Sequence, residues 1–202
     1  MINKLAVKLA ENLLIKQSIK EEERELYIYG FFMLLSHLMY FILASFFGLL
    51  FGIFGESIIF YVLFQFIRRN AGGYHAATET RCEILSTLLI LSSIAIMKFL
   101  VLYNYRIVLL CVTFVMGIII YVFCPLDTPE KPLSKKEFIY FRKKSRIGLI
   151  CIFLTAVAFC ILKLNSLFVP CCVSIIAECV LITAGKIKKV KTGINNESKS
   201  KL

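Results

Sequence analysis

The residues best suited to chemistry are a histidine and a cysteine, His75 and Cys82, which lie seven positions apart. Both fall in the polar stretch FIRRNAGGYHAATETRCEILS, residues 66–86, which separates two apolar runs. An imidazole within reach of a thiol can take its proton, and the resulting thiolate is a strong nucleophile. Spacing alone leaves two other hypotheses open, a packing role and a metal site, although two ligands fall short of the four that structural zinc takes.

The chain around Cys82 carries signals for the start of a helix. Thr80 and Glu83 have the capping-box spacing, which would begin a helix at Thr80, and Thr78 is a rival cap. With the start at Thr80, Cys82 lies in the first turn, where free backbone N–H groups and the helix dipole stabilise a thiolate. Three carboxylates are candidates to orient the imidazole: Glu79, Glu83 and Asp127.

Positive charge and glycine flank the same pair. Arg68, Arg69 and Arg81 lie close to it in sequence, and a cationic neighbour favours the thiolate. Gly72 and Gly73 permit a tight backbone turn or the close approach of a peptide chain. We expect these residues to support the pair or to bind a substrate.

The elements that must position these residues are apolar helices. Apolar residues make up 59% of the 202 residues, and a soluble domain carries about 45–50%. Apolar runs cover residues 26–50, 53–67, 84–102, 108–123, 147–162 and 167–184. A bilayer requires about 20 apolar residues per helix, so the sequence predicts an all-α, polytopic membrane helical bundle with about six spans. The second run is short, and a four-span bundle with re-entrant pieces is the alternative.

The basic residues predict the orientation of this bundle. Of the 24 lysines and arginines, 21 fall in residues 1–25, 68–83, 125–146 and 185–202, between or outside the apolar runs. The positive-inside rule therefore predicts a multi-pass protein of the cell membrane, with both termini and the loop of residues 68–83 in the cytoplasm. The net charge of +11 follows this topology, and no nucleic-acid partner is expected.

Both ends of the chain lie outside the bundle of residues 26–184. Residues 1–25 contain an amphipathic helix, which suits the membrane interface, although packing on the bundle fits its periodicity equally well. Ser18 and Glu21 have capping-box spacing and predict the next helix start. Residues 185–202 are basic and polar, which predicts disorder. No cleavable signal peptide is expected.

The remaining cysteines and the second histidine have ordinary explanations. Seven cysteines lie within or at the end of apolar runs, where a free thiol behaves as a small hydrophobe, and no disulfide framework is expected. His37 lies in the first apolar run and is predicted to be a packed, hydrogen-bonded core residue. A small transporter or peptide exporter would place polar groups in several spans, and the sequence offers few: His37, Glu56, Lys98 and Glu178.

Two stretches carry a resemblance to a known family. Residues 68–76 read RRNAGGYHA, with a cysteine seven residues after the histidine, and this string resembles the signature of the accessory gene regulator B family. Residues 124–137, CPLDTPEKPLSKKE, are similar to the Pro-rich, Lys-bearing loop of that family. The resemblance extends over nearly the whole chain through its length, number of spans and loop order.

The resemblance implies an integral membrane cysteine endopeptidase that processes a quorum-sensing peptide of Gram-positive bacteria. His75 and Cys82 match the catalytic pair, and Arg68 and Gly73 match residues that the family needs near it. The implied partner is an AgrD-like precursor peptide with an amphipathic leader and an acidic C-terminal tail. A homodimer in the lipid bilayer is also implied, without cofactor or metal.

The implied reaction releases the acidic tail through a thioester on Cys82 and closes the product into a thiolactone or lactone. The basic loop with Lys131, Lys135 and Lys136 is a candidate docking surface for the tail, and positive-inside topology explains the same charges. A membrane transporter or peptide exporter without proteolytic activity is the alternative function.

Overall fold

The computed structural model describes residues 2–16, 20–73, 79–103, 105–126 and 134–199, with side chains described except at 79–80 and 191–199. The described residues form helices and one isolated β-bridge: α1 (Ile2–Ile15), the 3-10 helix η1 (Glu21–Glu23), α2 (Arg24–Leu50), α3 (Phe54–Ala71), α4 (Glu79–Leu102), α5 (Arg106–Phe123), α6 (Lys135–Ile161) and α7 (Asn165–Lys199). Each predicted apolar run lies within a helix to within one residue at its ends, which confirms the all-α class.

Five of the helices are long and apolar enough to cross a membrane, namely α2 with η1, α4, α5, α6 and α7. The predicted run that is missing from this set is the second, residues 53–67, which corresponds to α3; this helix has 18 residues and carries Glu56, Arg68 and Arg69. A helix of that length reaches about 27 Å, slightly less than the ~30 Å hydrocarbon core of a bilayer. Its charged ends keep α3 out of the set, so the structure supports five candidate spans where the sequence predicts about six.

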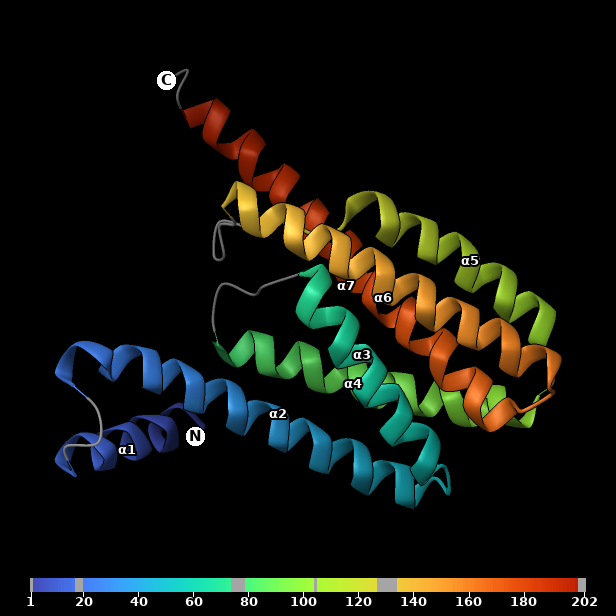
Figure 1. Ribbon diagram of the computed structural model, residues 1–202, viewed down its shortest axis with the longest axis horizontal. Helices are drawn as coiled ribbons and strands as arrows, with labels where there is room; N and C mark the ends of the chain where they lie inside the picture. The colour runs from blue at the N-terminus through green and yellow to red at the C-terminus, as the bar shows by residue number, and fades with distance from the viewer. Residues whose placement is uncertain (1, 17–19, 74–78, 104, 127–133, 200–202) are drawn as a thin grey trace.

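Helix α7 forms the centre of the bundle and packs against α3, α4, α5 and α6 (Figure 1). In its candidate span 67% of the residues are buried, against 17–28% in the other four. The outer helices therefore expose apolar side chains, as expected of helices that face lipid. Because α7 touches so many neighbours, a polar group on it can reach the ends of several helices.

The N-terminal helix α1 lies against α2, outside the main bundle (Figure 1). Ala6 and Ala10 are fully buried, and Glu11 pairs with Arg24 of α2 at 3.2 Å. Periodicity allows α1 either to lie in the membrane interface or to pack on the bundle, and the structure shows α1 packed on α2. Leu5 of its apolar stripe is 48% exposed, and insertion of this stripe into the membrane interface stays a prediction.

Some local predictions differ from the structure. Ser18 lies outside the described residues, and the next helix begins with η1, where the Glu23 carboxylate accepts the Lys20 N–H at 3.1 Å. The side chain of His37 is exposed on α2, so the prediction of a packed core residue is wrong; its backbone carbonyl accepts the Tyr61 hydroxyl at 2.8 Å. The backbone of α7 is helical to Lys199, over residues whose composition predicts disorder from 185.

Cations on aromatic faces mark the end of the bundle where α5 ends and α7 leaves it. The Arg146 guanidinium lies 4.1 Å from the ring centroid of Tyr121, and the Lys186 ammonium lies 3.1 Å from that of Phe123. Aromatic and basic side chains gather at membrane–water interfaces. At this same level of the bundle, the turn after α3 meets the loop after α5.

Helices α2 and α3 approach each other closely at a glycine. A Cβ atom on Gly48 would overlap the Ser57 hydroxyl and come within 3.2 Å of the Phe54 Cα. Gly117 in the interior of α5 has nothing within 4 Å of its Cβ position, so it provides a matched control.

Gly48→Ala should destabilise the protein by about 1–3 kcal/mol, because overpacking forces α2 and α3 apart. Gly117→Ala should be neutral or stabilise by up to about 1 kcal/mol, since alanine is the better helix former. Thermal unfolding of both variants in the same detergent checks this. Equal unfolding midpoints would contradict the close packing of α2 on α3.

Candidate active site

The polar stretch starts at the end of α3 and continues into α4. Helix α3 ends at Ala71, and the N–H of Gly72 donates to the Arg68 carbonyl at 3.2 Å. Gly72 has a φ of 75° and Gly73 a φ of 135°, in the region that favours glycine. His75 lies outside the described residues, between this turn and the start of α4.

The side chain of Arg68 folds back over this glycine turn. Its Nη1 donates to the Gly72 carbonyl at 2.8 Å and lies 3.9 Å from Oε1 of Glu178 on α7. A Cβ atom on Gly73 would overlap that same Nη1 and lie 3.5 Å from Oε1 of Glu178. Arg68 and Gly73 are therefore complementary in shape: the guanidinium occupies the space that any larger side chain at 73 would need.

The loop that begins at Cys124 joins the glycine turn after α3 through backbone pairing. Gly72 forms a parallel β-bridge with Leu126, and the Leu126 N–H donates to the Ala71 carbonyl at 2.9 Å. A Cβ atom on Gly72 would come within 2.8 Å of the Leu126 carbonyl oxygen. The stretches that begin at Arg68 and Cys124 thus lie at one end of the bundle, as their shared charge pattern predicts.

Cys82 is the fourth residue of α4, in its first turn, and is half-buried. The helix begins at Glu79, so Thr80 lies inside it and the prediction of a Thr80 cap is wrong; the rival Thr78 falls outside the described residues. Tyr40 of α2 pairs with Ser86, one turn further along α4, and lies within electrostatic range of Cys82. The thiol therefore belongs to the side of α4 that turns toward α2.

The other cysteine near this end, Cys124, is packed away. It is 2% exposed, its thiol is in hydrogen-bond contact with Ser145, and burial raises the pKa of the Cys124 thiol above its ordinary value. All eight cysteines are free, as expected, and no group of three potential metal-ligating side chains occurs in the described part of the chain. Cys82 is thus half-buried, whereas Cys124 is buried.

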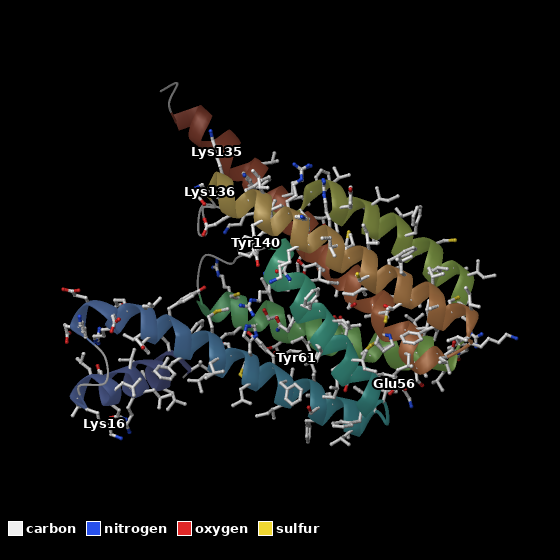
Figure 2. All side chains as sticks on the ribbon, in the orientation of Figure 1. Lys16, Glu56, Tyr61, Lys135, Lys136 and Tyr140 are labelled. Atoms are coloured by element: carbon white, nitrogen blue, oxygen red, sulfur yellow. The ribbon has the colours of Figure 1, made fainter. Side chains whose placement is uncertain are left out.

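The structure does not gather all of the predicted site residues. Arg69 and Arg81 are exposed, and Glu83 is half-buried near Tyr40. The side chain of Glu79 is not described, and Asp127 and Lys131 lie outside the described residues. Lys135 and Lys136 are exposed at the start of α6 (Figure 2), which Ser134 caps by accepting the Glu137 N–H at 3.3 Å.

A pocket of about 340 Å³ opens beside the bridge between the two loops. Its walls come from the end of α5, the start of α6 and α7: Phe123, Pro125, Leu126, Phe138, Lys186, Lys189 and Val190. Leu126 lines this pocket and also pairs with the glycine turn. The pocket is apolar with two lysines, which suits a ligand that combines apolar and anionic groups.

Glu178 is the residue of this region that sequence reasoning did not assign to the site. A lone carboxylate in an apolar span is a signal of function, since burying a charge is costly. Its partner Arg68 lies in another helix, far away in the sequence, and no spacing rule connects the two. Only the packing of α3 on α7 brings them together.

Comparisons with known proteins give a consistent result. The chain matches the family described as accessory gene regulator B over residues 2–183. It is 28% identical over 159 residues to an AgrB-like protein of Clostridium perfringens, which covers 76% of this chain and 74% of that protein. It is 29% identical over 156 residues to the protein FsrB of Enterococcus faecalis, 76% of this chain and 58% of that protein. No solved structure matches the chain.

A charged, water-soluble thiol reagent should modify Cys82 at least about ten times faster than the other cysteines of the protein in lipid nanodiscs. Cys82 is at a helix start near the end of the bundle, whereas Cys124 is buried with a raised pKa and Cys151 is exposed halfway along α6. An apolar maleimide should reach Cys151 as well. Peptide mapping by mass spectrometry checks the order, and preferential labelling of Cys151 by the charged reagent would contradict it.

Proposed function

The chain belongs to the accessory gene regulator B family, a family of multi-pass membrane proteins of autoinducer processing, and from this we propose that it is a cysteine endopeptidase. Its substrate is a small AgrD-like precursor peptide, and the reaction removes the acidic C-terminal tail. Cys82 is the nucleophile and His75 its base. The observation that carries the proposal is the fit of Arg68 against Gly72 and Gly73. This fit explains physically why an arginine and two glycines stand next to His75 and Cys82 in the sequence.

The first half of the proposed reaction forms an acyl-enzyme. The imidazole of His75 takes the proton of the Cys82 thiol, and the thiolate attacks the precursor carbonyl that precedes the tail. The C–N bond breaks, the leaving amine takes the proton from the imidazolium, and the tail departs. The precursor is then held as a thioester on the Cys82 sulfur.

The second half closes the ring. The thiol of a cysteine within the precursor attacks the thioester, a thiolactone forms, and the proton returns to the Cys82 sulfur; a serine would give a lactone. Exchange of one thioester for another changes the bond energy little, so ring strain is the cost to be offset. Water would hydrolyse the intermediate, and the half-buried position of Cys82 between α4 and α2 supports its exclusion.

The basic end of the bundle supports docking of the acidic tail. Lys135 and Lys136 are exposed at the start of α6, and Lys186 lines the pocket beside Leu126. Complementary charge would orient the precursor and raise its rate of association. The same lysines fit the positive-inside rule, which predicts that this end, the termini and the site face the cytoplasm.

Cys82→Ala, Cys82→Ser and His75→Ala should each lower tail release by at least about 100-fold, because nucleophile and base act as one unit. The assay is mass spectrometry of the precursor and free tail after incubation with the protein in vesicles. Cys151→Ala, on the exposed side of α6, is the matched control and should keep wild-type activity. Tail release that survives loss of either member of the pair would refute the proposed dyad.

Neutralising the two exposed lysines tests the docking proposal. The double variant Lys135→Gln, Lys136→Gln should raise KM for the precursor by about threefold to tenfold at low salt with kcat unchanged, since rim charges act on association. The difference should shrink as ionic strength rises. An unchanged KM at low salt would leave topology as the sole role of these two charges.

A further inference from the structure

Glu178 is the one charged side chain that is fully buried among the described residues. Its exposed fraction is 0%, and neither carboxylate oxygen has a hydrogen-bond partner within the described structure. Removing a carboxylate from water is costly unless a positive charge compensates for it. An apolar residue of similar size would fill the same space without this cost. The carboxyl group of Glu178 therefore points to a role other than packing.

The compensating charge is Arg68, and it is already committed to the glycine turn. Its Nη1 lies 3.9 Å from Oε1 of Glu178, beyond hydrogen-bond length but well within electrostatic reach. The same nitrogen donates to the Gly72 carbonyl at 2.8 Å. One guanidinium nitrogen of Arg68 thus lies near both the Gly72 carbonyl and the Glu178 carboxyl group.

Gly73 completes the arrangement. A Cβ atom there would overlap Nη1 of Arg68 and come within 3.5 Å of Oε1 of Glu178, so the backbone of the turn passes directly over both charges. The Arg68 side chain as a whole is 20% exposed, whereas that of Glu178 is fully buried. Loss of the Glu178 carboxyl group would remove one of the interactions that keep Arg68 over the turn, and the bond from Nη1 to the Gly72 carbonyl would weaken.

We propose that Glu178 is a positioning residue, whose buried carboxyl group, 3.9 Å from the guanidinium, holds Arg68 over the turn at Gly72 and Gly73 from which the chain continues toward His75. This inference rests on the proposed function for its kinetic consequence only. Glu178 touches neither substrate nor the reacting atoms, and it acts through the Arg68 side chain. It extends the site from the α3–α4 loop to the central helix of the bundle.

The kinetic test is Glu178→Gln, which keeps the size of the side chain and removes its charge. We expect kcat for tail release to fall by about tenfold or more, with KM within about twofold, since the tail is bound elsewhere. Glu178→Asp, which keeps the charge, should recover part of the loss. Glu56→Gln at the opposite end of α3 (Figure 2) is the matched control and should behave as wild type.

A double-mutant cycle with Arg68→Gln separates positioning from general structural support. If Glu178 acts through Arg68, adding Glu178→Gln to Arg68→Gln should leave kcat unchanged, and the two single losses should not multiply. Losses that multiply, or a wild-type kcat in Glu178→Gln, would overturn the inference. If Glu178→Gln alone fails to fold, kcat of Arg68→Gln is compared with kcat of the double variant. A lower kcat in the double variant would show that Glu178 acts by a route other than Arg68, and would overturn the inference.

Hydrogen–deuterium exchange of the full-length protein in nanodiscs gives a readout that needs no activity. Glu178→Gln should speed exchange over residues 68–83 by about tenfold, with no change over α5, whereas Glu56→Gln should leave residues 68–83 as in wild type. Unchanged exchange in Glu178→Gln overturns the inference even if the chain releases no tail. Absence of tail release from wild type would refute the proposed function alone.

Discussion

The site depends on one guanidinium that is held between a carbonyl and a carboxylate from different helices. Nη1 of Arg68 donates to the Gly72 carbonyl at 2.8 Å and lies 3.9 Å from Oε1 of Glu178 on the central helix α7. This contact fixes how the chain leaves α3, and Leu126 then pairs with the turn from the other side. The turn after α3, the loop after α5 and the interior of α7 are thereby joined. In lipid, where unsatisfied polar groups are costly, such a junction is a strong constraint on the structure.

The bilayer explains why the rest of the bundle needs few polar contacts. The outer helices expose apolar side chains and α7 is largely buried, so the bundle needs little polar contact within its spans. Polar groups concentrate instead at the end where α3 stops, α4 starts and α5 leads into its loop. Cys82 in the first turn of α4 lies at this end, together with the basic start of α6. A reaction on a peptide that lies at the membrane surface is consistent with this distribution.

Sequence reasoning predicted the helices, because apolar runs and polar flanks are local signals. It also predicted the use of Gly72 and Gly73, whose positive φ values the turn requires. It missed the membership of Glu178 in the site, since that depends on the packing of α3 on α7, and it misplaced His37 because periodicity does not say which side of α2 faces the core. The number of spans differs by one at α3, whose length and charged end put it at the limit of what composition can decide.

The covalent step is the centre of this account, and it can be observed directly. The protein should be incubated with a precursor whose internal cysteine is replaced by alanine, so that the ring cannot close and the acyl-enzyme persists. Intact-mass and peptide mapping should then show the tail-less precursor attached to Cys82 through a bond that hydroxylamine cleaves, as a thioester requires. Free tail without any adduct on Cys82, or an adduct on another residue, would contradict the account.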